Sequence, residues 1–229
     1  MRIAIITPYY KEPTEVLRRC HDSVKAQTYP ATHFMLADGH PNPEVDNWDV
    51  VHIKLPAHGD SGDTPRAIGA LSASAQGFDA ISLLDADNWF ESDHIASLLD
   101  VQKQSGSQVV TVARTLRRVD GSILGHCIES NGRTFNDTNC YLIIKDVFYI
   151  FSTWGFKSQG MGAVGDRIFW NNIMQAGFSR THIPRSTVNY VTTWANHYLA
   201  RNEEPPPGAK IMTEPTKGRF ELIPYKPIK

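Results

Sequence analysis

The sequence predicts an α/β domain with a mainly parallel central sheet and helices on both of its faces. Short apolar runs alternate with segments of helical periodicity through the first half of the 229 residues, an order typical of parallel sheets. Most runs are apolar at consecutive positions, as in strands that are buried on both faces. Hydrophobic residues make up 41% of the chain and charged residues 21%, which is ordinary for a globular domain.

The first half is expected to hold five strands with helices between them. Strands are predicted at 3–6, 34–37, 50–53, 80–84 and 109–112. A first helix is expected from Pro13, in the position of its first turn, to about residue 28, because apolar residues recur there on one helical face. Two further helices are expected after Thr64 and Ser92, which are both residue types that cap helix N-termini.

The second half is less regular. A strand is predicted at 141–144, a short helix at 147–151, and a longer helix from Arg167 to Ala176 that Gly177 closes. Four glycines within 155–165 predict a flexible loop. Six of the 14 prolines lie in 203–229, so we expect a tail that is extended around the domain or partly disordered.

Charge and cysteine usage exclude several classes of protein. The formal net charge is −1, which argues against a dedicated nucleic-acid-binding protein. Three scattered cysteines make neither a disulfide framework nor a Cys-x-x-Cys metal site. No apolar run approaches the length of a signal-peptide core or a membrane span. A cytoplasmic location is expected, peripheral membrane contact stays open, and the oligomeric state is not predicted.

The segment Asp85-Ala86-Asp87 follows the apolar run 80–84 and says most about chemistry. In extended chain, residues two apart point to the same side, so the two carboxylates are expected to project together from the end of a buried strand. Oxygen ligands of this kind suit Mn²⁺ or Mg²⁺, with positions left for substrate phosphates. The alternative is an ordinary strand-to-helix corner whose acids bind nothing.

Other polar residues follow the neighbouring strands. Thr7-Pro8-Tyr9-Tyr10 offers a hydroxyl, backbone N–H groups and an aromatic face to a nucleotide, and Asp38 offers an acceptor for a base N–H. The loop 58–66 ends in Arg66, whose planar fork suits a phosphate. Each segment alone also fits a simple turn. In open α/β sheets, however, ligands bind beyond the carboxyl ends of the strands, where these residues are expected.

Taken together, these stretches resemble the family-2 inverting glycosyltransferases, which have the GT-A fold. The match runs through 3–10, 23–30, Asp38-Gly39, 66–69 and 83–88 in the order of the family. It covers about residues 1–200, with the nucleotide-binding half at about 1–115, the acceptor half at about 116–200 and a tail over 201–229. The resemblance implies a GT-A-like domain in that range.

The resemblance also implies roles for individual residues. Thr7, Pro8, Tyr10 and Asp38 would line the nucleotide pocket, Arg66 would lie near the nucleotide or diphosphate, and Asp85-Ala86-Asp87 would form the metal-binding Asp-x-Asp motif. His197 lies where some members place a further histidine ligand to the same metal; its alternative is a packed residue beside aromatics. The cofactor would be Mn²⁺ or Mg²⁺.

Two departures from the family pattern concern the base. One acid, Asp38, stands where the family commonly has paired acids, and Gly165-Asp166 replaces its Glu-Asp before a helix. Asp166 is therefore the candidate general base, against the alternative that it only caps the helix. The Gln-x-x-Arg-Trp motif of processive synthases is absent from the sequence, so the resemblance implies transfer of one sugar per event.

The sequence-based hypothesis is a metal-dependent inverting transferase. It moves one sugar from a nucleoside-diphosphate donor, by default a UDP-sugar, to the hydroxyl of a glycan, lipid-linked or protein acceptor. A catalytically silent nucleotide-sugar-binding module is the first alternative, because a fold does not by itself imply turnover. A sugar nucleotidyltransferase fits less well, since residues 7–10 contain no glycine-rich basic loop.

Overall fold

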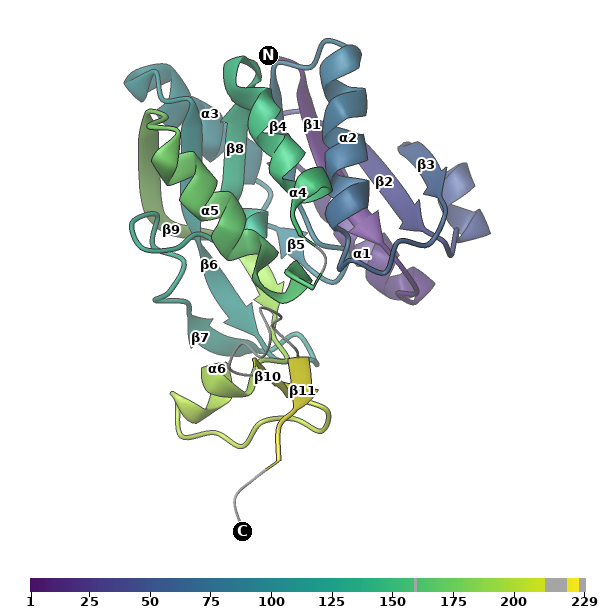
Figure 1. The fold of residues 1–229 in the computed structure, drawn as a ribbon, viewed down its shortest axis with the longest axis vertical. Coiled ribbons are helices and arrows are strands. Elements are labelled where there is room, and N and C mark those ends of the chain that lie inside the picture. Colours follow the sequence, from purple (N-terminus) through teal and green to yellow (C-terminus); the bar gives the residue numbers. More distant parts are fainter. Residues whose placement is uncertain (159, 213–221, 227–229) are drawn as a thin grey trace.

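A computed structural model describes residues 1–158, 160–212 and 222–226. Nine of the described strands form one sheet in the order β3-β2-β1-β4-β8-β6-β9-β5, with β7 added to β6 (Figure 1). Their bounds are β1 Ile3–Tyr9, β2 Thr32–Asp38, β3 Val51–Leu55, β4 Ala80–Leu83, β5 Trp89–Phe90, β6 Val109–Arg117, β7 Ile123–His126, β8 Tyr141–Ile144 and β9 Arg180–Val191. This confirms the predicted α/β class and the predicted strands, most of which extend further than expected.

The sheet changes direction at its centre. Strands β3, β2, β1 and β4 run parallel to one another. β8 then lies between β4 and β6 and runs antiparallel to both, whereas β6 and β9 are parallel to each other. Because β8 is reversed, the chain that enters β8 lies at the same edge of the sheet as the chain that leaves β4. That edge carries the candidate site.

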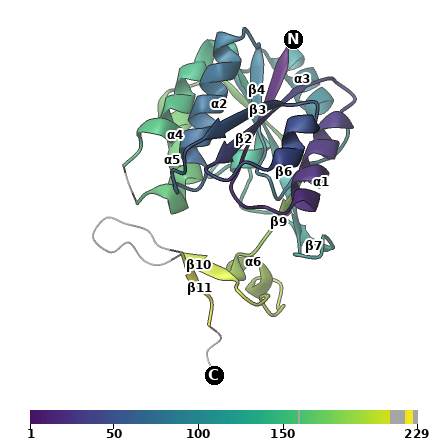
Figure 2. The ribbon, with the colours of Figure 1, turned by 90° about the vertical axis from the view of Figure 1, so that its right-hand side faces the viewer.

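Helices cover both faces of the sheet, as predicted. Helices α1 (Thr14–Lys25) and α3 (His94–Ser105) lie on one face, and α2 (Asp63–Ala75), α4 (Ser152–Phe156) and α5 (Gly165–Gln175) lie on the other (Figure 2). Alternate residues of β1 pack into two hydrophobic cores, one on each face of the sheet. Ile3 and Ile5 pack in the α1/α3 core, and Ala4 and Ile6 pack in the α2/α4/α5 core, because successive strand residues point to opposite faces.

Helix α2 lies unusually close to the sheet at Gly69. A Cβ atom at Gly69 would lie 2.6 Å from Cγ2 of Ile6 and 2.9 Å from Cδ1 of Leu36. Only glycine leaves room for both side chains at this crossing. The close approach brings the N-terminal turn of α2, and with it Arg66, to the ends of β1 and β4.

Besides α5, which begins at Gly165 and not at Arg167, two helix starts differ from the predictions. Helix α2 begins at Asp63, not after a Thr64 cap, because Gly62 with φ of 81° turns the chain into the helix two residues earlier. Helix α3 begins at His94 after Asp93 and not directly after Ser92. Both differences move a boundary by one or two residues and leave the helices themselves as predicted.

The segment between β8 and α5 is more helical than predicted. The short helix expected at 147–151 lies inside a 3-10 helix, η3 (Lys145–Phe151), which continues into α4. Within the predicted loop 155–165, α4 extends to Phe156 and a 3-10 turn, η4, spans Gly162–Val164. Two further 3-10 turns are η1 (Pro43–Asn47) and η2 (Thr138–Cys140).

Parts of the described C-terminal region form regular structure. Helix α6 (Ala195–Leu199) is followed by β10 (Lys210–Met212) and β11 (Leu222–Pro224), which pair as an antiparallel ribbon below the main sheet (Figure 1). The rest of the predicted tail, 213–221 and 227–229, lies outside the described residues. Among the described residues, no helix combines the length and the apolar character that crossing a membrane requires.

Candidate active site

Two adjoining pockets lie at the edge of the sheet where β4 ends and the chain enters β8, one beside the ends of β1 and β2 and the other beside α5. The first, of about 580 Å³, is called the Asp85 pocket. The second, of about 500 Å³, is called the Asp166 pocket. Tyr190 of β9 lines both, so the pockets are neighbours. Seven of the predicted nucleotide-site residues line the Asp85 pocket: Pro8, Tyr10, Asp38, Arg66, Asp85, Ala86 and Asp87.

Thr7 is the predicted nucleotide-site residue that does not reach the pocket. Its side chain is fully buried, and its hydroxyl lies 2.8 Å from Nε2 of His33 and beside the thiol of Cys20. Thr7 shares the side of β1 with Ile3 and Ile5, which face α1, so its hydroxyl points away from the pocket. The expectation of a Thr7 hydroxyl contact to a nucleotide is corrected accordingly.

Asp38 lies in the Asp85 pocket, but its carboxylate is already occupied. The backbone N–H of His58 donates to Oδ1 at 2.8 Å, the Nδ1 atom of the His58 ring lies 2.9 Å from the same oxygen, and the N–H of Gly59 donates to Oδ2 at 3.3 Å. These bonds tie the loop before α2 to the end of β2. A ligand N–H that binds Oδ1 of Asp38 therefore has to take the place of the His58 ring.

Arg66 and Asp85 form the central ion pair of the Asp85 pocket. Nη2 of Arg66 donates to Oδ1 of Asp85 at 2.5 Å, and Nη1 donates to the carbonyl oxygen of Ser61 at 2.9 Å. Nη1 also lies 3.4 Å from the carboxylate of Asp63, which pairs in turn with Lys157. The guanidinium is largely buried, so it is held in place before any ligand arrives.

Asp87, like Glu12, is a carboxylate of the Asp85 pocket that forms no ion pair with a described side chain. It is open to solvent on the pocket side, yet neighbouring protein displaces much of the water around its carboxyl. This desolvation, followed by the negative charges of Asp85 and Glu12, raises the pKa of Asp87 to about 7. Within the described residues, no other side chain donates a hydrogen bond to this carboxylate. Nη2 of Arg19 donates to the backbone carbonyl oxygen of Asp87 at 2.8 Å, and its charge offsets only part of the rise in pKa.

This chemistry fits a divalent cation that enters together with an anionic ligand. Among the described residues, no group of three His, Cys, Asp or Glu side chains is placed to hold a metal. Asp87 and Oδ2 of Asp85, which also accepts a hydrogen bond from Asn139, are carboxylate ligands, and Mg²⁺ in proteins commonly combines one or two carboxylates with substrate phosphates. His197 lines the Asp166 pocket and not the Asp85 pocket, so the structure does not bring it to the two aspartates.

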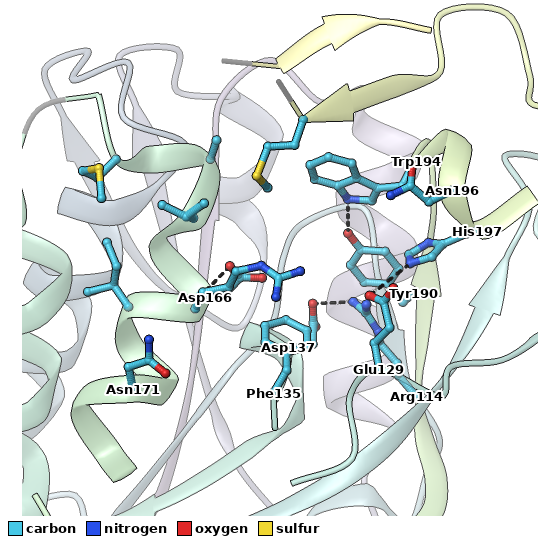
Figure 3. Close-up of a pocket in the computed structure, with 16 residues that line it drawn as sticks. Arg114, Glu129, Phe135, Asp137, Asp166, Asn171, Tyr190, Trp194, Asn196 and His197 are labelled. Carbon is cyan, nitrogen blue, oxygen red and sulfur yellow. Dashed lines mark hydrogen bonds and ion pairs between the residues drawn. The ribbon is translucent and has the colours of Figure 1, made fainter. Parts of the chain in front are cut away.

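The Asp166 pocket gathers carboxylates and a histidine around an open space (Figure 3). Asp166 is the second residue of α5 and not its N-cap, because the helix begins at Gly165 after Val164. Its Oδ1 accepts a hydrogen bond from the N–H of Arg167 at 2.7 Å. Desolvation, followed by the charge of Asp137, raises the pKa of Asp166 to about 6.

The other acidic groups of the Asp166 pocket have partners. Asp137 is buried and pairs with Arg114 on the floor of the pocket. Glu129 lies 3.8 Å from Nε2 of His197, and this contact lowers the pKa of Glu129. The Nδ1 atom of His197 lies 2.7 Å from the hydroxyl of Thr192. Asp166 is thus the carboxylate in this pocket for which no described side chain is an arginine or histidine partner.

Sequence reasoning missed several residues of the site. Lys210 of β10 and Leu222 of β11 line the Asp85 pocket, although they lie in the segment expected to be a tail. Glu12 lines the same pocket, and the side chain of Asn139 donates a hydrogen bond to the carboxylate of Asp85. No local pattern identifies them. The one available signal was position, because Glu12 follows the end of β1 and Asn139 precedes a predicted strand.

Comparisons with known proteins agree with this architecture. The family model described as "Glycosyl transferase family 2" matches residues 4–162. No curated protein sequence matches the chain. Among solved structures, TarS 1–349 of S. aureus in complex with UDP is similar with a TM-score of 0.65 and 11% identity, over 87% of this chain and 63% of that one. TarS 1–349 in complex with UDP-GlcNAc is similar with a TM-score of 0.60 and 12% identity, over 87% of this chain and 64% of that one.

The likeness to TarS extends over part of that protein only. The longer TarS structure has a TM-score of 0.62 at 11% identity, over 87% of this chain and 38% of its own. The chain thus spans less than two thirds of the TarS structures it resembles. At this level of identity the similarity shows a shared fold, and it confirms the predicted GT-A-like architecture.

Proposed function

Because the chain belongs to glycosyl transferase family 2, we propose that it moves one sugar from a nucleoside-diphosphate sugar to an acceptor hydroxyl with inversion at the sugar carbon. The observation that carries the proposal is the pair of pockets that meet at Tyr190. One holds a cationic side chain and an uncompensated carboxylate, and the other holds a carboxylate with a raised pKa. A single displacement needs groups that stabilise the departing diphosphate on one side of the reacting carbon and a base for the acceptor hydroxyl on the other side.

The Asp85 pocket is the proposed donor site. Pro8, Tyr10 and Asp38 line its nucleotide side, and Arg66 and Lys210 supply positive charge. Asp87, with Asp85, would hold Mn²⁺ or Mg²⁺ against the diphosphate, and the cation would neutralise charge on the departing nucleoside diphosphate. Without the donor, the described residues supply too few ligands for a closed metal shell. We therefore propose that cation and donor bind together, with a UDP-sugar as the default donor.

The Asp166 pocket is the proposed acceptor site. A general base works best with a pKa near the working pH, and the pKa of Asp166, raised to about 6, leaves the carboxylate ionised at neutral pH and able to take the acceptor proton. The neighbouring acids are held by Arg114 and His197, which favours Asp166 for this role. A glycan, a lipid-linked sugar or a protein hydroxyl would all satisfy the chemistry.

Release of nucleoside diphosphate tests the proposal. The protein is incubated with UDP-, GDP- and dTDP-sugars, with Mn²⁺, Mg²⁺ or EDTA, and free nucleoside diphosphate is measured. Slow hydrolysis of one donor that requires a divalent cation supports an enzyme. Binding of a donor by thermal shift, without release under any condition and with a range of acceptors, would instead favour a silent nucleotide-sugar-binding module.

A further inference from the structure

Asn139 is a fully buried side chain that joins the two pockets. It lies in η2, directly before β8, and its exposed fraction is 0%. Its Nδ2 donates to Oδ2 of Asp85 at 2.9 Å and to Oδ1 of Asp137 at 2.8 Å. Its Oδ1 accepts from the backbone N–H of Asp85 at 2.5 Å. The carboxamide therefore holds Asp85 by both its backbone and its side chain.

These contacts form one continuous row of partners across the floor of the site. Arg66 pairs with Asp85, Asn139 bridges Asp85 and Asp137, and Asp137 pairs with Arg114. Asp85 lines one pocket, and Asp137 and Arg114 line the other. The row contains two cations, two anions and one neutral amide, so its charges balance without a ligand.

Only an amide fits the middle of this row. The two protons of Nδ2 go to two different carboxylates, and the amide oxygen takes the one backbone donor. A carboxylate at this position would add a third negative charge and remove both donors. An apolar side chain would leave the Asp85 backbone N–H without its partner, which is costly for a buried group.

We propose that Asn139 is a positioning residue of the transfer reaction, which fixes the carboxylate of Asp85 in the orientation that faces Arg66 and the donor diphosphate. The proposal rests on the proposed function of the Asp85 pocket. Partners that orient a metal-binding carboxylate commonly contribute 10- to 100-fold to metal affinity or activity. Asn139 touches neither substrate nor cation and acts through Asp85.

Asn136 provides a matched control. It is also fully buried, and its Nδ2 donates to the backbone carbonyls of Asp137 and Cys140 at 3.2 and 3.3 Å. None of its hydrogen bonds reaches Asp85. A truncation of Asn136 therefore reports the general cost of removing a buried amide next to the same 3-10 turn.

The test measures binding of a nucleoside diphosphate with Mn²⁺ by calorimetry, using whichever of UDP, GDP and dTDP binds the wild-type protein most tightly. For Asn139→Ala, we expect the Kd to rise by about 10- to 100-fold, with kcat reduced as well. Asn136→Ala should lower the Tm by a similar amount and leave the Kd within about 3-fold. Equal Kd changes in the two variants would overturn the proposal.

A double-mutant cycle separates positioning from structure. If Asn139 acts through Asp85, adding Asn139→Ala to Asp85→Asn should change the Kd by less than about 2-fold, because coupled residues are not additive. Additive losses would overturn the proposal. If Asn139→Ala does not fold, Asn139→Ser, which keeps one hydrogen-bonding group, enters the same cycle with the same criteria.

Failure of the proposed function has a different signature. In that case the wild-type protein itself binds none of the three nucleoside diphosphates with either cation and releases none from their sugars. A wild-type protein that binds normally, beside an Asn139→Ala variant that also binds normally, contradicts the positioning role alone.

Discussion

Nη2 of Arg66 lies 2.5 Å from Oδ1 of Asp85, so the guanidinium compensates one of the two carboxylates in Asp85-Ala86-Asp87, whereas the other has no ion-pair partner among the described residues. The two acids of the motif are therefore not equivalent. Asp85 is fixed from both sides by Arg66 and Asn139, whereas Asp87 faces the pocket with a raised pKa. The need for a divalent cation is concentrated at Asp87.

The first prediction follows from this asymmetry. Asp87→Ala should abolish Mn²⁺-dependent nucleoside-diphosphate binding, measured by calorimetry, because it removes the carboxylate that would bind the cation. Its Tm should stay level or rise slightly, since the variant also removes a desolvated charge next to Asp85 and Glu12. Normal binding of nucleotide and Mn²⁺ by Asp87→Ala would show that the cation does not bind at this aspartate.

The second prediction concerns the general base. Asp166→Asn keeps the shape of the side chain but cannot accept a full proton, so turnover should fall by about 10²- to 10⁴-fold while donor binding is retained. Because the base must be ionised, kcat of the wild-type protein, measured with saturating donor and cation so that Asp87 stays ionised, should fall about tenfold per pH unit below pH 6, the pKa of Asp166. Asp146→Asn, an exposed change in η3, is the control. Normal turnover by Asp166→Asn would exclude Asp166 as the base.

The third prediction concerns Lys210. Its side chain is exposed, lines the Asp85 pocket, and has no ion-pair partner among the described residues. A charge-assisted bond to the diphosphate contributes about 1.5–3 kcal/mol, so Lys210→Ala should weaken nucleoside-diphosphate binding about 10- to 100-fold, and Lys210→Arg should retain most of it. Lys103→Ala, on the exposed side of α3, should leave the Kd unchanged. A Lys210→Ala protein that binds like Lys103→Ala would remove Lys210 from the donor site.

The fourth prediction is a dependence of stability on pH. Burial, and then the neighbouring His21, lowers the pKa of His33 to about 3. Below the ordinary pKa of about 6.5 the unfolded chain takes up a proton that the folded protein excludes, so stability falls as the pH falls. His33→Gln should reduce the loss of unfolding free energy between pH 7 and 5.5 by about 1 kcal/mol in urea titrations. The exposed His126→Gln variant should lose as much unfolding free energy over this pH range as the wild-type protein. A His33→Gln protein that also loses as much as the wild-type protein would contradict the prediction.

The fifth prediction tests the close approach of α2 to the sheet. In most helices, alanine is more favourable than glycine by up to about 1 kcal/mol. At Gly69, however, a Cβ would overlap with Ile6 and Leu36, so Gly69→Ala should lower the free energy of unfolding by about 1–3 kcal/mol. Ser74→Ala, at an exposed position of the same helix, should change it by less than about 0.5 kcal/mol. A stabilised Gly69→Ala protein would show that the sheet tolerates the added carbon.

The strands were predictable because burial on both faces leaves a continuous apolar run in the sequence. The orientation of Thr7 follows from the same rule, since it is four residues from Ile3 and shares the α1 side of the strand. The resemblance to the family did not reveal the orientation of Thr7, because it identifies the segment but not the side of the strand that each residue faces. Helix starts were less predictable, since Gly62 sets the start of α2 through a backbone angle.

Contacts between distant residues could not be predicted from the sequence. Asn139 and Asp85 are 54 residues apart, and they meet only because β8 pairs antiparallel with β4. Lys210 reaches the Asp85 pocket because its N–H donates to the carbonyl oxygen of Thr193 and thereby anchors β10. Proline content predicted an extended tail, but it carries no information on where an extended segment docks.

The reversed strand β8 also determines how the chain can be divided. Residues up to about 115 were expected to form the nucleotide-binding half, yet β8, at Tyr141–Ile144, lies between β4 and β6. An N-terminal fragment that ends at residue 115 would lack β8, so the edges of β4 and β6 that pair with β8 would be exposed. Exposed strand edges promote aggregation. Because β4 can be joined to β6 only after β8 has been synthesised, folding must wait for residues that lie far along the chain. Split or chimeric versions of this protein should therefore be joined outside the interval from β4 to β9.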